Sequence, residues 1–121
     1  MQTLPQTENL KFDKRVFTML TKIKNELVII DWRAMSVSQL ALNIAEQIRD
    51  ISDSLQTPIF RIDERFTIYY GDKPFELGKK AFRSFLVWCL KHIGLPIELI
   101  HGKSFPHKLF DCCREILKPE E

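Results

Sequence analysis

Cysteine is scarce in this chain of 121 residues, and its placement argues against several kinds of site. The three cysteines are Cys89, Cys112 and Cys113. An odd number, with two adjacent in sequence, does not fit a disulfide framework and is typical of reduced thiols in a cytoplasmic protein. Because no C-x-x-C motif and no histidine pair stands at ligand spacing, we expect neither a metal site nor another cofactor.

Long apolar runs are also missing. The longest, "FLVWCL" at 85–90, is about six residues, whereas a membrane-spanning helix needs roughly 20. The opening residues "MQTLPQTENL" lack the apolar segment of a secretory signal. The sequence therefore predicts a cytoplasmic location without membrane contact.

A strong charge of either sign is absent, because the net charge is only +2. That total favours neither nucleic acid nor membrane as a partner. The distribution is less even, since residues 1–60 carry seven basic and seven acidic side chains. Residues 79–108 carry six basic side chains, one acidic side chain and all three histidines. Any site for an anion should therefore lie within residues 79–108.

The length and a 45% share of hydrophobic residues are typical of one globular domain. We expect a polar lead-in over residues 1–10, followed by a single α+β domain over residues 11–118. Apolar residues spaced by three and four predict helices. These helices are expected at about 13–24, 36–53, 74–93 and 104–117.

Short apolar runs between these helices predict strands. The runs are "ELVIIDW" at 26–32, "PIFRI" at 58–62, "FTIYY" at 66–70 and "PIELI" at 96–100. Residues Asp63–Arg65 leave room only for a hairpin between the second and third strands. The resulting β-α-β-β-α-β order predicts a ferredoxin-like, four-stranded antiparallel sheet with an extra helix at each terminus. The alternative is an open α/β sheet with helices on both faces.

The segment His101-Gly102-Lys103-Ser104 resembles the end of a phosphate-binding loop but lacks the loop's first glycine, because Ile97 occupies that position. A smaller site is still conceivable, in which Ser104 caps the last helix and its free N–H groups meet an anion. The predicted anion or nucleic-acid site comprises Lys79, Lys80, Arg83, His101, Lys103, Ser104 and His107. The alternative is a capped helix with solvated polar neighbours.

Catalytic groups are harder to assemble. Carboxylates at predicted strand ends could hold a metal or divide acid and base roles, but hairpin acids such as Asp63 are normally solvated. Cys89 lies on the buried stripe of a helix, where a thiol behaves as a small hydrophobe. No positioned base can be named for Cys112. The sequence names no catalytic residue and favours a non-catalytic role over an enzyme.

The predicted third helix is apolar nearly all round, so it must be covered on more than one side. Its large side chains Phe82, Phe85, Leu86 and Trp88 are typical anchors of a protein interface. Alternatively, the two terminal helices cover them within one chain. We expect a small intracellular binding or regulatory module that acts through protein contacts, with a partner protein or as a homodimer. The alternative is a nucleic-acid or phosphate binder that uses residues 79–108.

Overall fold

The computed structural model describes residues 14–28, 31–54, 61–63, 66–70 and 73–118. The lead-in expected over residues 1–10 lies outside this part of the chain. Most of the described residues are helical. The long helices are α2 (Lys14–Glu26), α3 (Val37–Ser54), α4 (Lys79–His92) and α6 (Ser104–Ile116), and the short ones are η1 (Trp32–Ala34) and α5 (Ile97–Ile100).

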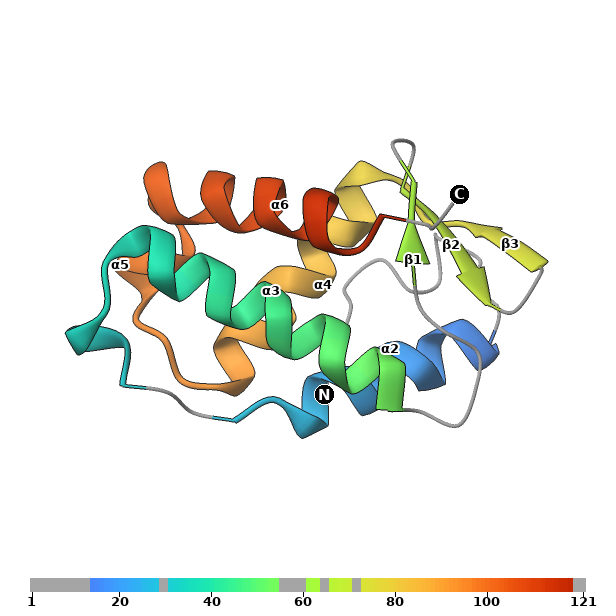
Figure 1. Ribbon diagram of the computed structural model, residues 1–121, viewed down its shortest axis with the longest axis horizontal. Helices are drawn as coiled ribbons and strands as arrows, with labels where there is room; N and C mark the ends of the chain where they lie inside the picture. The colour runs from blue at the N-terminus through green and yellow to red at the C-terminus, as the bar shows by residue number, and fades with distance from the viewer. Residues whose placement is uncertain (1–13, 29–30, 55–60, 64–65, 71–72, 119–121) are drawn as a thin grey trace.

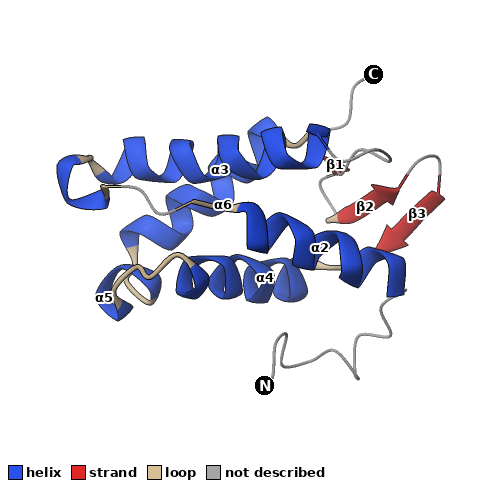
Figure 2. Cartoon of the chain, turned by 90° about the horizontal axis from the view of Figure 1, so that it is seen from below, coloured by secondary structure: helices blue, strands red, loops and turns tan. Residues whose placement is uncertain are grey.

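The four long helices surround one core (Figure 1). Helix α3 packs along α6, and α2 contacts both α3 and α4. An aromatic contact links α4 to α6, with 6.0 Å between the ring centroids of Phe82 and Phe110. Helix α5 lies at one end of this bundle and the strands at the other (Figure 2). Each long helix therefore contacts two of the other long helices.

The strands form a small antiparallel sheet in the order β1-β2-β3. They are β1 (Arg61–Ile62), β2 (Thr67–Tyr70) and β3 (Lys73–Glu76). The backbone N–H of Ile62 donates to the carbonyl of Leu117 at 2.9 Å, which joins β1 to the end of α6. The hairpin predicted around Asp63 pairs in the antiparallel sense, with Ile62 opposite Ile68. Residues 58–60 of the predicted second strand lie outside the described residues.

The expected α+β, ferredoxin-like fold with a four-stranded sheet is wrong, because the chain is mainly helical. The predicted strand at 96–100 is instead the helical turn α5, in which the N–H of Ile100 donates to the carbonyl of Pro96 at 3.1 Å. Ile97 is 62% exposed and Ile100 is 3% exposed. Periodicity alone cannot distinguish a short apolar strand from a buried helical turn.

The predicted strand at 26–32 is also wrong over its described residues. Helix α2 continues to Glu26, and the N–H of Leu27 still donates to the carbonyl of Lys24 at 3.2 Å. Val28 is 59% exposed, and its N–H donates to the side chain of Gln47 at 3.0 Å. With a glutamine side chain in place of a neighbouring strand, this segment has no ladder to join.

Proline and glycine explain where α4 begins and ends. Pro74 was expected in the first helical turn, but it lies in β3 at the edge of the sheet, where a missing N–H is tolerated. Helix α4 starts only after Gly78, whose φ of 90° suits glycine. The helix end predicted at about residue 93 is confirmed, since α4 ends at His92 and Gly94 follows the C-cap residue with a φ of 81°.

The core is formed mainly by aliphatic and aromatic side chains. The largest side chains with almost no exposure include Phe82, Phe85, Phe105, Leu20, Ile23, Leu40, Ile44 and Ile48. They come from all four long helices, so the core lies along the centre of the bundle. Within the described ranges, no helix combines the length and the apolar character that crossing a membrane requires.

Candidate functional site

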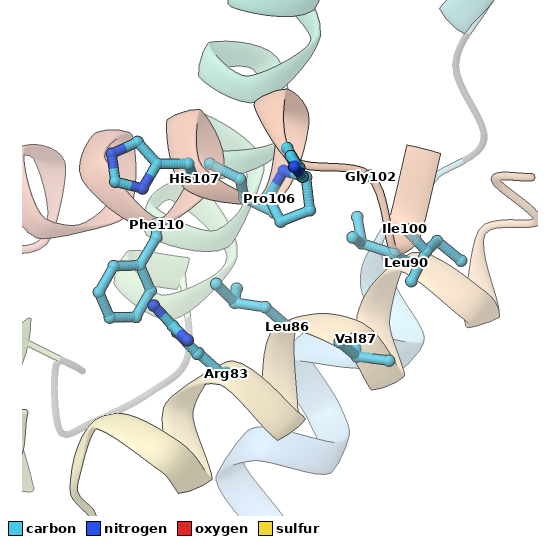
Figure 3. A pocket seen from close by; sticks show the side chains of 11 residues that line it. Arg83, Leu86, Val87, Leu90, Ile100, Gly102, Pro106, His107 and Phe110 are labelled. Atoms are coloured by element: carbon cyan, nitrogen blue, oxygen red, sulfur yellow. The ribbon is translucent and has the colours of Figure 1, made fainter. Parts of the chain in front are cut away.

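A cleft of about 270 Å³ opens between α4 and α6 and is bounded at one end by α5 (Figure 3). Its lining residues are Arg83, Leu86, Val87, Leu90, Ile100, Gly102, Lys103, Pro106, His107, Leu109 and Phe110. The aliphatic residues Leu86, Leu90, Ile100 and Leu109 are each at most 4% exposed, so they belong to the core as well as to the cleft. The cleft therefore has a fixed apolar floor.

Cations stand at the edge of this floor. Arg83, Lys103 and His107 are all exposed, and none of the lining residues, all of which the structure describes, is acidic. The Arg83 side chain reaches from α4 to the Phe110 ring of α6, with its guanidinium carbon 4.9 Å from the ring centroid (Figure 3). The Nε2 atom of His107 lies 3.6 Å from the carboxylate of Asp111. The negative charge of Asp111 therefore offsets any positive charge on the His107 ring. Arg83 and Lys103 are therefore the dominant charges at the rim.

Phe110 forms one wall of the cleft and is held on its other sides. Its ring centroid lies 5.0 Å from that of Phe66, in a stacked arrangement. Lys79 also approaches the ring, with its ammonium nitrogen 5.8 Å from the centroid. Such cation–π contacts contribute about 0.5–1 kcal/mol at exposed sites. This wall is therefore packed in place before any ligand arrives.

The turn between α5 and α6 forms the end of the cleft and leaves no space for a side chain at Gly102. A Cβ atom there would lie 2.7 Å from the carbonyl oxygen of Glu98. The cap predicted at Ser104 is wrong, because α6 begins with Ser104 itself and Lys103 is the N-cap residue. No side chain bonds to the helix start at that position. Lys103 therefore extends from the turn at the rim.

The structure brings together part of the predicted anion site. Arg83, Lys103 and His107 line the cleft, and Lys79 lies beside its Phe110 wall. The other three predicted residues, Lys80, His101 and Ser104, are exposed but do not line the cleft. The cations thus gather around an apolar hollow rather than around the start of α6.

Three of the four predicted interface residues are buried within the chain, and the fourth, Trp88, is partly buried. Phe82 and Phe85 are 0% exposed and Leu86 is 4% exposed. Trp88 stacks on Phe17 of α2, with 5.9 Å between ring centroids and 12° between ring planes. Helices α2 and α6 therefore cover α4, as in the alternative that the sequence left open. Only Leu86 of this group touches the cleft.

The cysteines are free thiols, and two of them are fully buried. Burial is the main cause that raises the pKa of the Cys89 and Cys113 thiols well above the ordinary value. These thiols stay protonated at neutral pH and are poor nucleophiles. Over the residues that the structure describes, no group of three histidine, cysteine, aspartate or glutamate side chains could hold a metal.

A second hollow has the opposite charge. It is more open than the cleft and lies beside η1 and the first half of α3. Asp31 and Glu46 contribute carboxylates, and Leu42 is 44% exposed within it. This acidic hollow is a control surface for experiments that measure binding to the basic cleft.

Sequence reasoning did not identify several lining residues, among them Val87, Leu90, Pro106 and Phe110. The available signal was that the predicted helices at 74–93 and 104–117 follow one another along the chain, and sequential elements are usually adjacent in space. Interpreting residues 96–100 as a strand placed a sheet between these helices and hid the cleft that they share.

Comparison of the chain with protein-family models, with curated proteins and with solved structures returns no match. A function is therefore inferred from the cleft and from the residues around it.

Proposed function

We propose that the chain is a small non-catalytic binding module that acts through protein contacts and uses the α4–α6 cleft as its binding surface. The observation that carries this proposal is an apolar floor, reached from the surface, beneath a basic rim. Protein interfaces have this composition, since an apolar centre supplies affinity and a polar rim surrounds it. Aromatic and arginine residues are common in such interfaces, and here Phe110 forms a wall of the cleft and Arg83 lies at its rim.

The groups at the cleft support binding rather than bond chemistry. The side chains of Arg83 and Lys103 offer hydrogen-bond donors at the rim. Cys89 and Cys113, which are near Leu90 and Phe110 in sequence, are protonated and buried in the core. We place the module in the cytoplasm, because free thiols persist in a reducing compartment.

Site-specific photo-cross-linking tests this proposal in cells. A photoreactive amino acid at His107, an exposed lining residue, should form an adduct with a defined protein that mass spectrometry identifies. The same amino acid at Lys22, exposed on α2, is the matched control and should give no such adduct. The captured protein, once purified, should bind the unmodified chain in calorimetry. Identical adducts at both positions, or none at His107, would contradict the proposal.

A second candidate is nucleic-acid binding, and the convergence of Arg83, Lys103 and His107 favours it. Phosphate contacts of this kind give an affinity that falls steeply with salt. Against it, the Trp88 ring is stacked and Phe110 is 5% exposed, so neither offers an open face for a base. Fluorescence anisotropy with labelled single-stranded RNA and DNA tests this candidate, and an absence of binding at low salt removes it.

A further inference from the structure

We infer that the partner segment is an acidic amphipathic helix that inserts one or two large apolar side chains between α4 and α6. This inference rests on the proposed function and adds to it the chemistry of the partner. The volume of the cleft indicates large apolar side chains, its length indicates helical spacing, and the positive charge of its rim indicates acidic residues.

The volume fits apolar side chains rather than a whole polypeptide segment. An engineered cavity of roughly 150 Å³ holds a benzene ring, so the cleft at about 270 Å³ has room for one or two large side chains. Leu86, Leu90 and Leu109 form its floor and are already excluded from water by their neighbours. An inserted leucine or phenylalanine would meet apolar atoms on several sides, which is the environment of an interface hot spot.

The length of the cleft fits helical spacing. Its lining on α4 extends from Arg83 to Leu90, which is about 10 Å along a helix axis. Two residues at i and i+4 of a partner helix are separated by about 6 Å along its axis, so both fit within this length. Grooves between two helices commonly bind a third helix through such spaced apolar anchors.

The positive charge of the rim indicates that the partner is negatively charged. The Arg83 guanidinium lies against the Phe110 ring of α6, and Lys103 lies in the turn between α5 and α6, so cations stand at two points on the rim of the apolar floor. Arg114 lies one helical turn beyond Phe110 and is exposed, which extends the basic surface along α6. Among the described neighbours of the cleft, Asp111 lies beside His107, but neither Arg83 nor Lys103 forms an ion pair. Glutamate or aspartate on both flanks of the anchors would complement these charges, and lysine or arginine would be repelled.

A peptide titration of the full chain tests the inference. The probe is a fluorescein-labelled, alanine-based helical peptide of about 16 residues, long enough for some helix in water. It carries leucine at i and i+4 and glutamate on both flanks. Two matched peptides replace glutamate by lysine, or both leucines by alanine. Anisotropy should show micromolar binding of the acidic leucine peptide and binding at least about tenfold weaker for each of the other two.

Protein variants locate the binding. Lys103→Glu changes an exposed residue and should leave the thermal unfolding curve close to that of the wild type. Arg83→Glu also removes the cation–π contact with Phe110, so it should lower the melting temperature by a few degrees. Each should weaken binding of the acidic peptide by about tenfold or more. Lys22→Glu, the same charge change on α2, should leave binding unchanged.

The outcomes separate this inference from the proposed function. If the acidic and lysine peptides bind equally well, the inference is overturned but the proposed function is not. The same conclusion follows if neither peptide binds while the His107 cross-link still forms. Tighter binding of single-stranded RNA than of the acidic peptide also overturns the inference, in favour of the nucleic-acid candidate. If no cross-link forms at His107 and no peptide binds, both the inference and the proposed function are overturned.

Discussion

At the scale of single residues, Phe66 joins backbone strain to the wall of the cleft. Its φ is 61°, in the region that side chains with a Cβ rarely adopt. Its ring is nevertheless buried, with centroids 5.0 Å from Phe110 and 5.5 Å from Phe82. Its carbonyl accepts hydrogen bonds from the N–H groups of Leu77 and Gly78. Aromatic packing therefore holds a backbone conformation that the residue itself disfavours.

Substitutions at Phe66 should reverse the usual order of alanine and glycine. Phe66→Ala removes the aromatic contacts and should cost about 3–5 kcal/mol of unfolding free energy. Phe66→Gly loses the same contacts but relieves the positive φ, so it should be more stable than Phe66→Ala by about 1 kcal/mol. Urea unfolding measures both. Phe82, buried inside α4, is the matched control, and there alanine should be the more stable. The same order at both sites would contradict the strain at Phe66.

The buried thiols should make stability depend on alkaline pH. Thiols in the unfolded chain ionise near pH ~8.5, whereas burial raises the pKa of Cys89 and Cys113 in the folded protein. Their contribution is therefore complete below about pH 8.5 and is lost as the pH rises further, by up to about 1.4 kcal/mol per pH unit for each thiol. Urea unfolding between about pH 8 and 10 measures this slope.

A cysteine variant separates this effect from other titrations. Cys113→Ala should unfold with a shallower pH slope than the wild type, because one of the buried thiols is gone. Cys112→Ala is the control, because Cys112 is only half-buried and its removal should change the slope less. Parallel slopes for the wild type and Cys113→Ala would show that the thiol does not stay protonated as described.

At the scale of elements, the start of α3 illustrates a local signal that the sequence carries on its own. The N–H of Gln39 donates to the Ser36 hydroxyl at 3.1 Å, and the N–H of Ser36 donates to the Gln39 side chain at 2.9 Å. Ser36 and Gln39 therefore form a capping box at the start of this helix. Such boxes involve residues three apart, so no distant part of the chain is needed to form them.

Removing this box should destabilise the chain measurably. Ser36→Ala should cost about 1 kcal/mol, because the N–H of Gln39 loses its acceptor. Ser38→Ala, at an exposed position two residues later, should change stability by no more than about 0.5 kcal/mol. Thermal unfolding followed by circular dichroism compares the two. A loss at Ser38 equal to that at Ser36 would contradict the role of the box.

The long helices and the β1–β2 hairpin were predictable, and the other short elements were not. Apolar spacing placed all four long helices, because a periodic stripe over three or more turns is a strong signal. The runs at 26–32 and 96–100 are too short for periodicity to distinguish strand from helix, and their structure depends on which segments pack beside them.

The cleft also depends on how distant segments pack. Its cations were visible in the sequence, but their gathering around Leu86 and Leu90 depends on how α4 meets α6.

At the scale of the whole molecule, the helices account for the apolar surface of α4 within one chain. Because Phe82, Phe85 and Leu86 are buried by α2 and α6, covering them requires no second copy. We therefore expect a monomer at high concentration, measured by size-exclusion chromatography with light scattering. A dimer that persists on dilution would instead indicate an interface between copies. The acidic hollow beside α3 would then be the first surface to test against the basic cleft.

Nuclear magnetic resonance of the full chain with the acidic leucine peptide bound would show which surface of the protein the peptide contacts. We predict intermolecular Overhauser contacts from the peptide's leucine methyl groups to those of Leu86, Val87 and Leu90 in the cleft. The methyl groups of Leu42, in the acidic hollow, should show none. Contacts at Leu42, or on helices away from α4 and α6, would contradict the assignment of the cleft as the binding surface.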